Sequence, residues 1–227
     1  MSVLRRSAAH LFVDDLSSPV PSDDDRHHLA RVLRLRDGES VTVSDGHGAW
    51  RPCVWRSGGL APAGDVARVA AGGDSTVVFA LSKGDKPELV VQKLTEVGVA
   101  RIVPVVAERS VVRWDDAKSA RNAERLRRVA REAAMQSRRC SIPEVTEVVP
   151  SVAEVVGRYG AGFAMAEPGA AEPTADVRTI AVGPEGGFTD DELALAPLVG
   201  LPGGVLRAET AAIVAGVVLA RLHGVER

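Results

Sequence analysis

Hydrophobic and polar positions follow one pattern in the first quarter of the chain and another in the rest. The first quarter holds short apolar runs with strand-like alternation, HLFV (10–13) and ESVTVSDGHGAWRPCVW (39–55), around one helical stretch, SDDDRHHLARVLRL (22–35). The dipeptide Asp45–Gly46 is a hairpin turn signal between two of the strands. We therefore predict a small, mostly β module at the start of the chain.

The helical stretch in this module has a clear start and two faces. Ser22 is a good N-cap residue, and Asp25 follows three positions later. Helical spacing predicts that its apolar residues form the buried side, namely Leu29, Val32, Leu33 and Leu35.

From about residue 75 onward, continuous apolar runs alternate with helical stretches. The strand candidates are TVVFALS (76–82), RIVPVVA (101–107), FAMAE (163–167), TIAVGP (179–184) and GGVLR (203–207). One helix, DKPELVVQKLTEVG, has Asp85 as a candidate N-cap and Gly98 as a stop signal, and a long arginine-rich helix and a closing helix, ETAAIVAGVVLARL, follow. This alternation predicts an α/β domain whose largely parallel sheet is covered by helices on both faces.

The two patterns meet in the stretch SGGLAPAGDVARVAAGGD, which is rich in Gly, Ala and Pro. Such a composition is typical of a connection between domains, so we place the boundary between about residues 57 and 75. The expected organisation is an N-terminal domain over 1–70 and a C-terminal domain over 75–227.

One loop of the C-terminal domain, VGPEGGFTDDE (182–192), carries a specific chemical signal. Thr189 and Glu192 have the spacing of a capping box, which predicts a helix that begins with Asp190 and Asp191 in its first turn. Glycine-rich turns before helices often hold phosphate, but these carboxylates would repel it. The loop therefore fits a neutral or cationic ligand better, and a tight strand-to-helix turn without any ligand is the competing interpretation.

Two other segments are expected at the same edge of the sheet. Ligands of open α/β sheets bind beyond the carboxyl ends of the strands, where AEP (166–168), GPEGG (183–187) and the region 201–210 should meet. The dinucleotide fingerprint GxGxxG is missing after the first strand, and no GxxxxGK[ST] motif occurs. A Rossmann dehydrogenase and a P-loop NTPase are therefore poor fits.

Composition and charge further limit the class of protein that this chain can be. The chain has 227 residues, 45% of them hydrophobic, so we expect a globular protein. Its two cysteines are far apart, and no continuous apolar segment lies near the start. We therefore expect a cytoplasmic protein without disulfides, a membrane span or a signal peptide. The net charge is −2, but residues 101–142 carry roughly +6 and the remainder to the C-terminus roughly −7. This distribution is consistent with a basic surface beside an acidic one. Arginine greatly outnumbers lysine, which suits phosphate contacts with RNA and is equally explained by a GC-rich genome.

Five segments of the chain resemble, in order, the signature segments of the RsmE family. They are HHLARVLRL, KGDKPELVVQKLTEVGV, REAAMQSRR, VGPEGGFTDDE and LRAETAA. GPEGG alone is shared with other SPOUT-class methyltransferases, whereas five segments in the right order and spacing are specific, and they span nearly the whole chain. The match departs from the family pattern in the last loop, where Pro202 replaces a usual glycine and Ala208 a usual threonine.

The resemblance implies a fold and an activity. It implies an N-terminal PUA-like barrel that binds RNA, a C-terminal SPOUT domain with a trefoil knot, and a homodimer. The implied reaction is methylation of uridine N3 in 16S small-subunit rRNA with S-adenosylmethionine as cofactor. Because that cofactor carries a sulfonium cation and no phosphate, it agrees with the acidic helix start after GPEGG.

The resemblance and the chemistry together give a set of expected site residues. Three are expected to be catalytic: Arg207, Arg139 and Glu209. Cofactor contacts are expected from Ala166, Glu167, Gly183, Pro184, Glu185, Gly186, Gly187, Leu201, Leu206, Arg207 and Thr210. RNA contacts are expected from Arg26, His27, Arg31, Arg34, Arg138 and Arg139.

Arginine suits the chemistry because a uracil that loses its N3 proton becomes an anion that a positive group stabilises. Glu132, Gln136 and Arg139 have helical spacing i, i+4 and i+7, which predicts one face that presents all three, or a solvated face with ordinary ion pairs. Glu209 is either a general base or a structural acid at a helix start, and the second interpretation is favoured.

Other candidate residues have structural explanations of equal or greater weight. Each glycine of GPEGG either contacts a ligand directly or is present only because its backbone adopts a positive φ. Trp50, Trp55 and Trp114 either stack on RNA bases or, more often for single tryptophans, fill a core. The adjacent His27 and His28 would point about 100° apart on a helix, so we expect no metal site there.

Three other functions compete with the main prediction. A SPOUT enzyme acting on tRNA or on a ribose hydroxyl would differ in its product. An RNA-binding assembly factor without catalysis would fail to bind S-adenosylmethionine. A nucleotide-binding protein is disfavoured by the missing phosphate loops and by Asp190 and Asp191.

Overall fold

The computed structural model describes residues 3–70 and 72–225, which form two compact units. Unit 1 contains residues 3–70 and 131–142, and unit 2 contains residues 72–130 and 143–225. Segment 131–142 therefore belongs to the N-terminal unit although it lies far along the chain. A long helix, α4 (Asp116–Ser137), contributes residues to both units.

Unit 1 is built on a five-stranded mixed sheet. Its strands are β1 (Ala9–Phe12), β2 (Ser40–Ser44), β3 (Ala49–Arg56), β4 (Gly59–Pro62) and β5 (Ala67–Arg68). β1 pairs parallel to β2, whereas β2, β4 and β5 all pair antiparallel to β3. The predicted hairpin turn is confirmed, because Gly46 has φ 79° and the Asp45 carboxylate accepts hydrogen bonds from two backbone N–H groups of the turn.

The helices of unit 1 are short. They are α1 (Val3–Arg6), α2 (Asp23–His27) and a π-helix, η1 (His28–Val32). Ser22 caps α2 as predicted, since its hydroxyl accepts a hydrogen bond from the Asp25 N–H. The sheet and helices share a core with Leu29, and Trp55 is buried within it.

The predicted buried side of this helical stretch is wrong in part. Leu29 is buried, but Val32 and Leu33 are 61% and 43% exposed. The reason is the π-helical turn, in which the Leu33 N–H reaches back five residues to the His28 carbonyl, so the helical period on which the prediction rested changes after Leu29. Arg34 then takes a left-handed conformation, with φ 52°.

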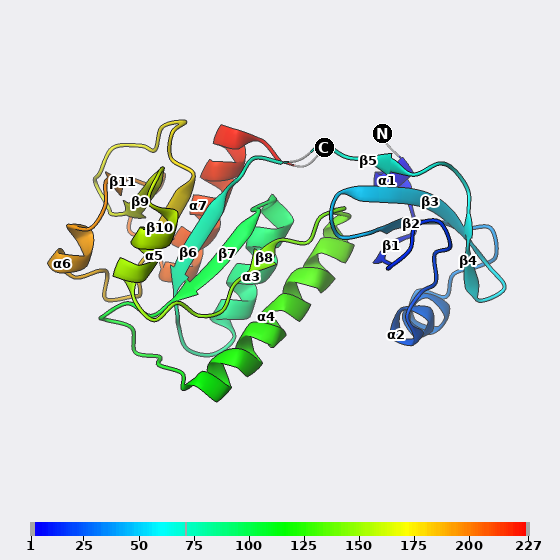
Figure 1. Ribbon diagram of the computed structural model, residues 1–227, viewed down its shortest axis with the longest axis horizontal. Coiled ribbons are helices and arrows are strands. Elements are labelled where there is room, and N and C mark those ends of the chain that lie inside the picture. The colour runs from blue at the N-terminus through cyan, green and yellow to red at the C-terminus, as the bar shows by residue number, and fades with distance from the viewer. Residues whose placement is uncertain (1–2, 71, 226–227) are drawn as a thin grey trace. The chain divides into compact units, whose positions relative to one another are not determined.

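Unit 2 is a six-stranded, all-parallel sheet in the order β11-β9-β10-β6-β7-β8 (Figure 1). The strands are β6 (Thr76–Ala80), β7 (Arg101–Val105), β8 (Glu144–Val145), β9 (Phe163–Ala166), β10 (Thr179–Val182) and β11 (Leu198–Val199). The predicted parallel α/β sheet is thus confirmed. Segment 203–207 is not the strand that its apolar pattern suggested, because β11 fills the edge position and Val205 is 93% exposed in a loop.

Helices cover both faces of this sheet. α3 (Lys86–Val97) and α7 (Ala208–His223) lie side by side on one face. On the other face, residues of α5 (Val152–Tyr159) pack with Val78, Val103 and Met165, and the short α6 (Asp190–Leu193) adds Leu193. Gly98 ends α3 with φ 98°, and Asp85 is its N-cap residue, both as predicted, although the Asp85 side chain makes no capping hydrogen bond.

Candidate active site

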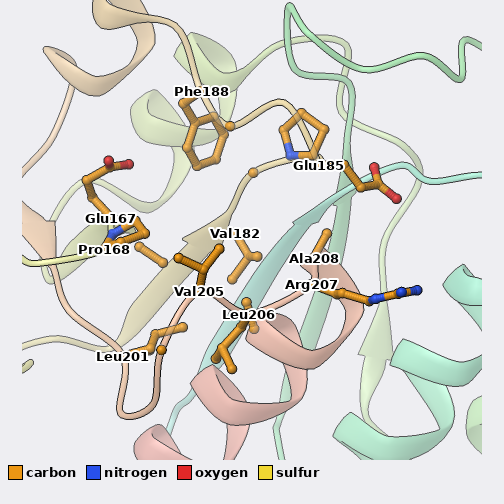
Figure 2. A pocket seen from close by; sticks show the side chains of 16 residues that line it. Glu167, Pro168, Val182, Glu185, Phe188, Leu201, Val205, Leu206, Arg207 and Ala208 are labelled. Atoms are coloured by element: carbon orange, nitrogen blue, oxygen red, sulfur yellow. The ribbon is translucent and has the colours of Figure 1, made fainter.

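A cavity of about 340 Å³ lies at the carboxyl ends of β9 and β10 in unit 2. Its walls come from three loops: 166–168 after β9, 183–188 after β10, and 201–208 between β11 and α7. Figure 2 shows Glu167 and Pro168 on one side of the cavity and Glu185 on the other. The three segments that the sequence pattern placed at one sheet edge therefore line one cavity, of the size usual for small-molecule sites.

The loop after β10 is held in place by a buried carboxylate. Glu192 is only 5% exposed and completes the predicted capping box, accepting a hydrogen bond from the Thr189 N–H at 2.9 Å while the Thr189 hydroxyl accepts from the Glu192 N–H at 3.2 Å. Its second oxygen accepts from the Glu108 N–H at 2.9 Å. The capping box therefore fixes the helix start and ties it to the segment after β7.

Two of the three glycines of GPEGG are required for structural reasons, and the two reasons differ. A Cβ at Gly183 would lie 3.1 Å from the Phe188 ring, so this position is restricted by packing under the loop. Gly187 has φ 70° and open space around it, so it is needed for its backbone conformation. Gly186 has neither constraint, and its carbonyl accepts a hydrogen bond from Arg109 at 3.1 Å.

The third loop leads directly into α7. Arg207 is the N-cap residue of that helix, and its exposed side chain extends on the same side of the cavity as Glu185 (Figure 2). Glu209, in the first turn, is paired with Lys86 at 3.3 Å, and the same ammonium lies 2.7 Å from Glu185. This ion-pair cluster joins the cavity loops to the start of α3.

Nine of the expected cofactor residues line the cavity, and two do not. Those in the lining are Ala166, Glu167, Gly183, Pro184, Glu185, Gly187, Leu201, Leu206 and Arg207, whereas Gly186 and Thr210 lie outside it. Phe188, Val182 and Ala211 also line the cavity but were not predicted as site residues, although Phe188 directly follows the GPEGG motif. Lys86 was likewise missed, although it lies in a segment that carries the family resemblance.

The expected catalytic Arg139 does not share a helix face with Glu132 and Gln136. α4 ends at Ser137, and Arg138 adopts a left-handed conformation with φ 57°, so the chain turns away before Arg139. The predicted common face is therefore wrong, because the helix does not continue to Arg139. Arg139 lies in unit 1, whereas Arg207 and Glu209 lie in unit 2.

A buried histidine in unit 1 holds this turn. His10 Nε2 lies 3.0 Å from the Arg139 carbonyl oxygen, and Nδ1 lies 2.9 Å from the Thr42 hydroxyl. A carbonyl only accepts, so Nε2 carries the proton and Nδ1 accepts from Thr42. Burial is the main cause that lowers the pKa of His10 to about 4, and the nearby Arg138 guanidinium lowers it further.

Four of the five remaining expected RNA-binding residues are exposed, and Arg138 is half-buried. Arg26, His27, Arg31 and Arg34 are all exposed on the α2–η1 segment, beside the acidic first turn of α2. Arg138 donates a hydrogen bond to the Ser7 carbonyl at 2.6 Å, so part of its guanidinium is used within unit 1.

The three tryptophans differ in their surroundings. Trp55 is 3% exposed and belongs to the core of unit 1, whereas Trp50 and Trp114 are partly exposed. Within residues 3–70 and 72–225, no group of three metal-ligating side chains is close enough to hold an ion. No helix in that part of the chain combines the length and the apolar character needed to cross a membrane.

Comparison with known proteins identifies both parts of the chain. An RNA methyltransferase domain model matches residues 72–220, and an RNA methyltransferase PUA domain model matches residues 21–54. The ribosomal RNA small subunit methyltransferase E of Mycobacterium bovis is 36% identical over 221 residues, covering 86% of this chain and 83% of that protein.

Solved structures have the same fold. A methyltransferase of Legionella pneumophila in complex with S-adenosylmethionine has a TM-score of 0.77 at 26% identity, covering 93% of this chain and 96% of its own. A ribosomal RNA small subunit methyltransferase E of Neisseria gonorrhoeae, bound to S-adenosylmethionine, has a TM-score of 0.78 at 23% identity, covering 95% and 98%. By sequence, domain content and fold, the chain belongs to the ribosomal RNA small subunit methyltransferase E (RsmE) family, with a PUA domain followed by an RNA methyltransferase domain.

Proposed function

We propose that this protein transfers a methyl group from S-adenosylmethionine to N3 of a uridine in 16S rRNA of the small ribosomal subunit. The observation that carries the proposal is the cavity at the carboxyl ends of β9 and β10, lined by the three loops that carry the family resemblance. The relative from Mycobacterium bovis, named for methylation of small-subunit rRNA, supports the RNA class of the substrate.

The cavity residues fit this cofactor. Apolar side chains, including Val182, Leu201 and Leu206, would enclose the adenine, while loop amides and carbonyls would read its edge. Glu167 and Glu185 supply negative charge at the cavity wall, which suits a ligand with sulfonium and ammonium groups. When bound there, S-adenosylmethionine would supply an electrophilic methyl group.

Arg207 is the residue that we assign to the substrate base. Its guanidinium is exposed beside the cavity, where it would stabilise the negative charge that appears on the uracil when N3 loses its proton. Arg139 is proposed to assist in holding the RNA. The ion pair with Lys86 favours a structural role for Glu209 over one as general base, because it ties the carboxylate to the frame of the site.

The N-terminal part is proposed to bind the RNA. We propose residues 1–70 as the RNA-binding domain and 75–227 as the catalytic domain, with Arg26, His27, Arg31, Arg34 and Arg138 among the RNA contacts. The exposure of the α2–η1 residues supports this assignment. The proposed working form is a homodimer in the cytoplasm, where ribosomal subunits are assembled.

Nucleoside mass spectrometry tests the reaction directly. Purified protein is incubated with S-adenosylmethionine and small ribosomal subunits from a strain that lacks the gene, and the rRNA is then digested. We expect 3-methyluridine to appear in 16S rRNA and to be missing from the untreated mutant. Formation of 2′-O-methyluridine, or methylation of tRNA alone, would contradict the assignment.

A further inference from the structure

Lys86 connects three elements of unit 2 through one ammonium group. It is the first residue of α3, and its Nζ lies 2.7 Å from Glu185 in the loop after β10 and 3.3 Å from Glu209 in the first turn of α7. Glu185 lines the cavity, and Glu209 follows two residues of the cavity lining, Arg207 and Ala208. The cluster therefore spans two of the three loops that form the cavity.

The charges of this cluster depend on one another. The hydrogen bond to Glu185 is the main cause that raises the pKa of Lys86, and Glu209 raises it further. The Lys86 hydrogen bond is in turn the main cause that lowers the pKa of Glu185. Without the ammonium, two carboxylates on neighbouring loops would repel each other.

Helix stability does not explain why a lysine occupies this position. A cation in the first turn of a helix faces the positive end of the helix dipole, which is unfavourable. The two carboxylates of the other elements offset this cost, since they surround the ammonium with negative charge. The lysine is therefore explained by the ion pairs that link α3 to the GPEGG loop and to α7, and not by the stability of α3 alone.

The link also affects the position of Arg207. Glu209 and Arg207 are two residues apart at the start of α7, so a carboxylate fixed by Lys86 fixes the helix start from which the Arg207 side chain extends. Arg207 itself is exposed and makes no ion pair within the part of the chain that the structure describes. Its direction is therefore set by the backbone at the N-cap.

We infer that Lys86 is a positioning residue for methyl transfer: it holds the GPEGG loop and the start of α7 at the separation that S-adenosylmethionine binding and the presentation of Arg207 require. This inference rests on the proposed function. It assigns a role to a residue outside the cavity lining, and that role is exerted through Glu185 and Glu209.

Calorimetry with S-adenosylmethionine and steady-state kinetics on small subunits test it. For Lys86→Met we expect the cofactor Kd to rise about fivefold, the order of effect of losing a partly exposed ion pair, together with a fall in kcat. Lys86→Arg keeps the charge and should restore most of both. Lys93→Met is the matched control, because Lys93 pairs with Glu96 on the same helix and does not line the cavity.

Glu209→Gln provides an independent measurement if Lys86→Met does not fold. Glu209 does not line the cavity, so weaker cofactor binding in this variant would act through the cluster, and a role as general base would leave cofactor affinity unchanged. Wild-type affinity and turnover in Lys86→Met, or wild-type affinity in Glu209→Gln, would overturn the inference. A wild-type protein that binds no S-adenosylmethionine would instead refute the proposed function.

Discussion

Three side chains, those of Glu192, Lys86 and His10, connect segments that lie far apart in the sequence through hydrogen bonds or ion pairs. The capping role of Glu192 could be predicted because the Thr189 partner is three residues away. The contact between His10 and Arg139 spans 129 residues, and no local pattern contains it.

Arg207 is expected to matter for turnover more than for cofactor binding. Arg207→Ala removes the cation that we assign to the uracil anion, so kcat should fall by about a hundredfold, the usual loss for one charge-stabilising donor. The cofactor Kd should change little. Arg221→Ala, an exposed arginine in the last turn of the same helix, is the control and should leave turnover intact. Equal activity in both variants would remove Arg207 from the reaction.

His10 should make stability depend on pH. Its pKa is about 4 in the folded chain and 6.5 ordinarily, so the unfolded chain binds more protons between these values. The free energy of unfolding should therefore fall as the pH drops from 6.5 to 4, by about 3 kcal/mol in total. Urea denaturation at several pH values measures this fall, and His10→Gln should show a shallower one. Parallel curves for the two proteins would contradict the assignment.

Among the elements, the strands and helices of unit 2 could be predicted from the sequence more reliably than the buried face of the helical segment in unit 1. Apolar runs of strand length next to capped helices identify β6, α3, β7, β9 and β10, because burial on both faces requires such runs. The buried face of the α2–η1 segment was misassigned since one π-helical turn changes the helical period. The helix face predicted to carry Glu132, Gln136 and Arg139 together is wrong for a related reason, the left-handed turn that ends α4.

Two helical glycines, one packed between α3 and α7 and one on an open face of α5, are expected to respond oppositely to substitution by alanine. A Cβ at Gly216 would lie 2.5 Å from Leu94 and 3.1 Å from Val99, so Gly216→Ala should destabilise the protein by about 1 kcal/mol despite the better helix propensity of alanine. Gly157 lies within α5 with no atom near its missing Cβ, so Gly157→Ala should stabilise by up to about 1 kcal/mol. Urea denaturation measures both, and changes of the same sign would contradict the packing.

At the scale of the whole molecule, segment 131–142 is part of the N-terminal unit although it follows much of the catalytic unit in sequence. Backbone hydrogen bonds from Gly48 to the Cys140 carbonyl and from Ile142 to the Gly46 carbonyl attach it there. The SPOUT knot and the homodimer that the resemblance implies stay predictions.

This organisation predicts the reactivity of the two cysteines. Both Cys53 and Cys140 are buried, so neither thiol of the intact protein should react with a thiol reagent before unfolding. In a fragment of residues 75–227, the partners of segment 131–142 are gone and Cys140 should react at once. Circular dichroism checks that the fragment is folded, and a protected Cys140 in a folded fragment would contradict the division into units.

The α/β class, the three loops of the cavity and the capped, acidic helix start could all be predicted from the sequence, because these depend on local periodicity and on spacings of a few residues. The folded chain was needed to see that Lys86 joins the GPEGG loop to the start of α7, that Gly183 is restricted by Phe188, and that the turn after α4 belongs to unit 1. Such contacts depend on which distant segments meet in space, and that is fixed by the packing of the complete sheet and its helices.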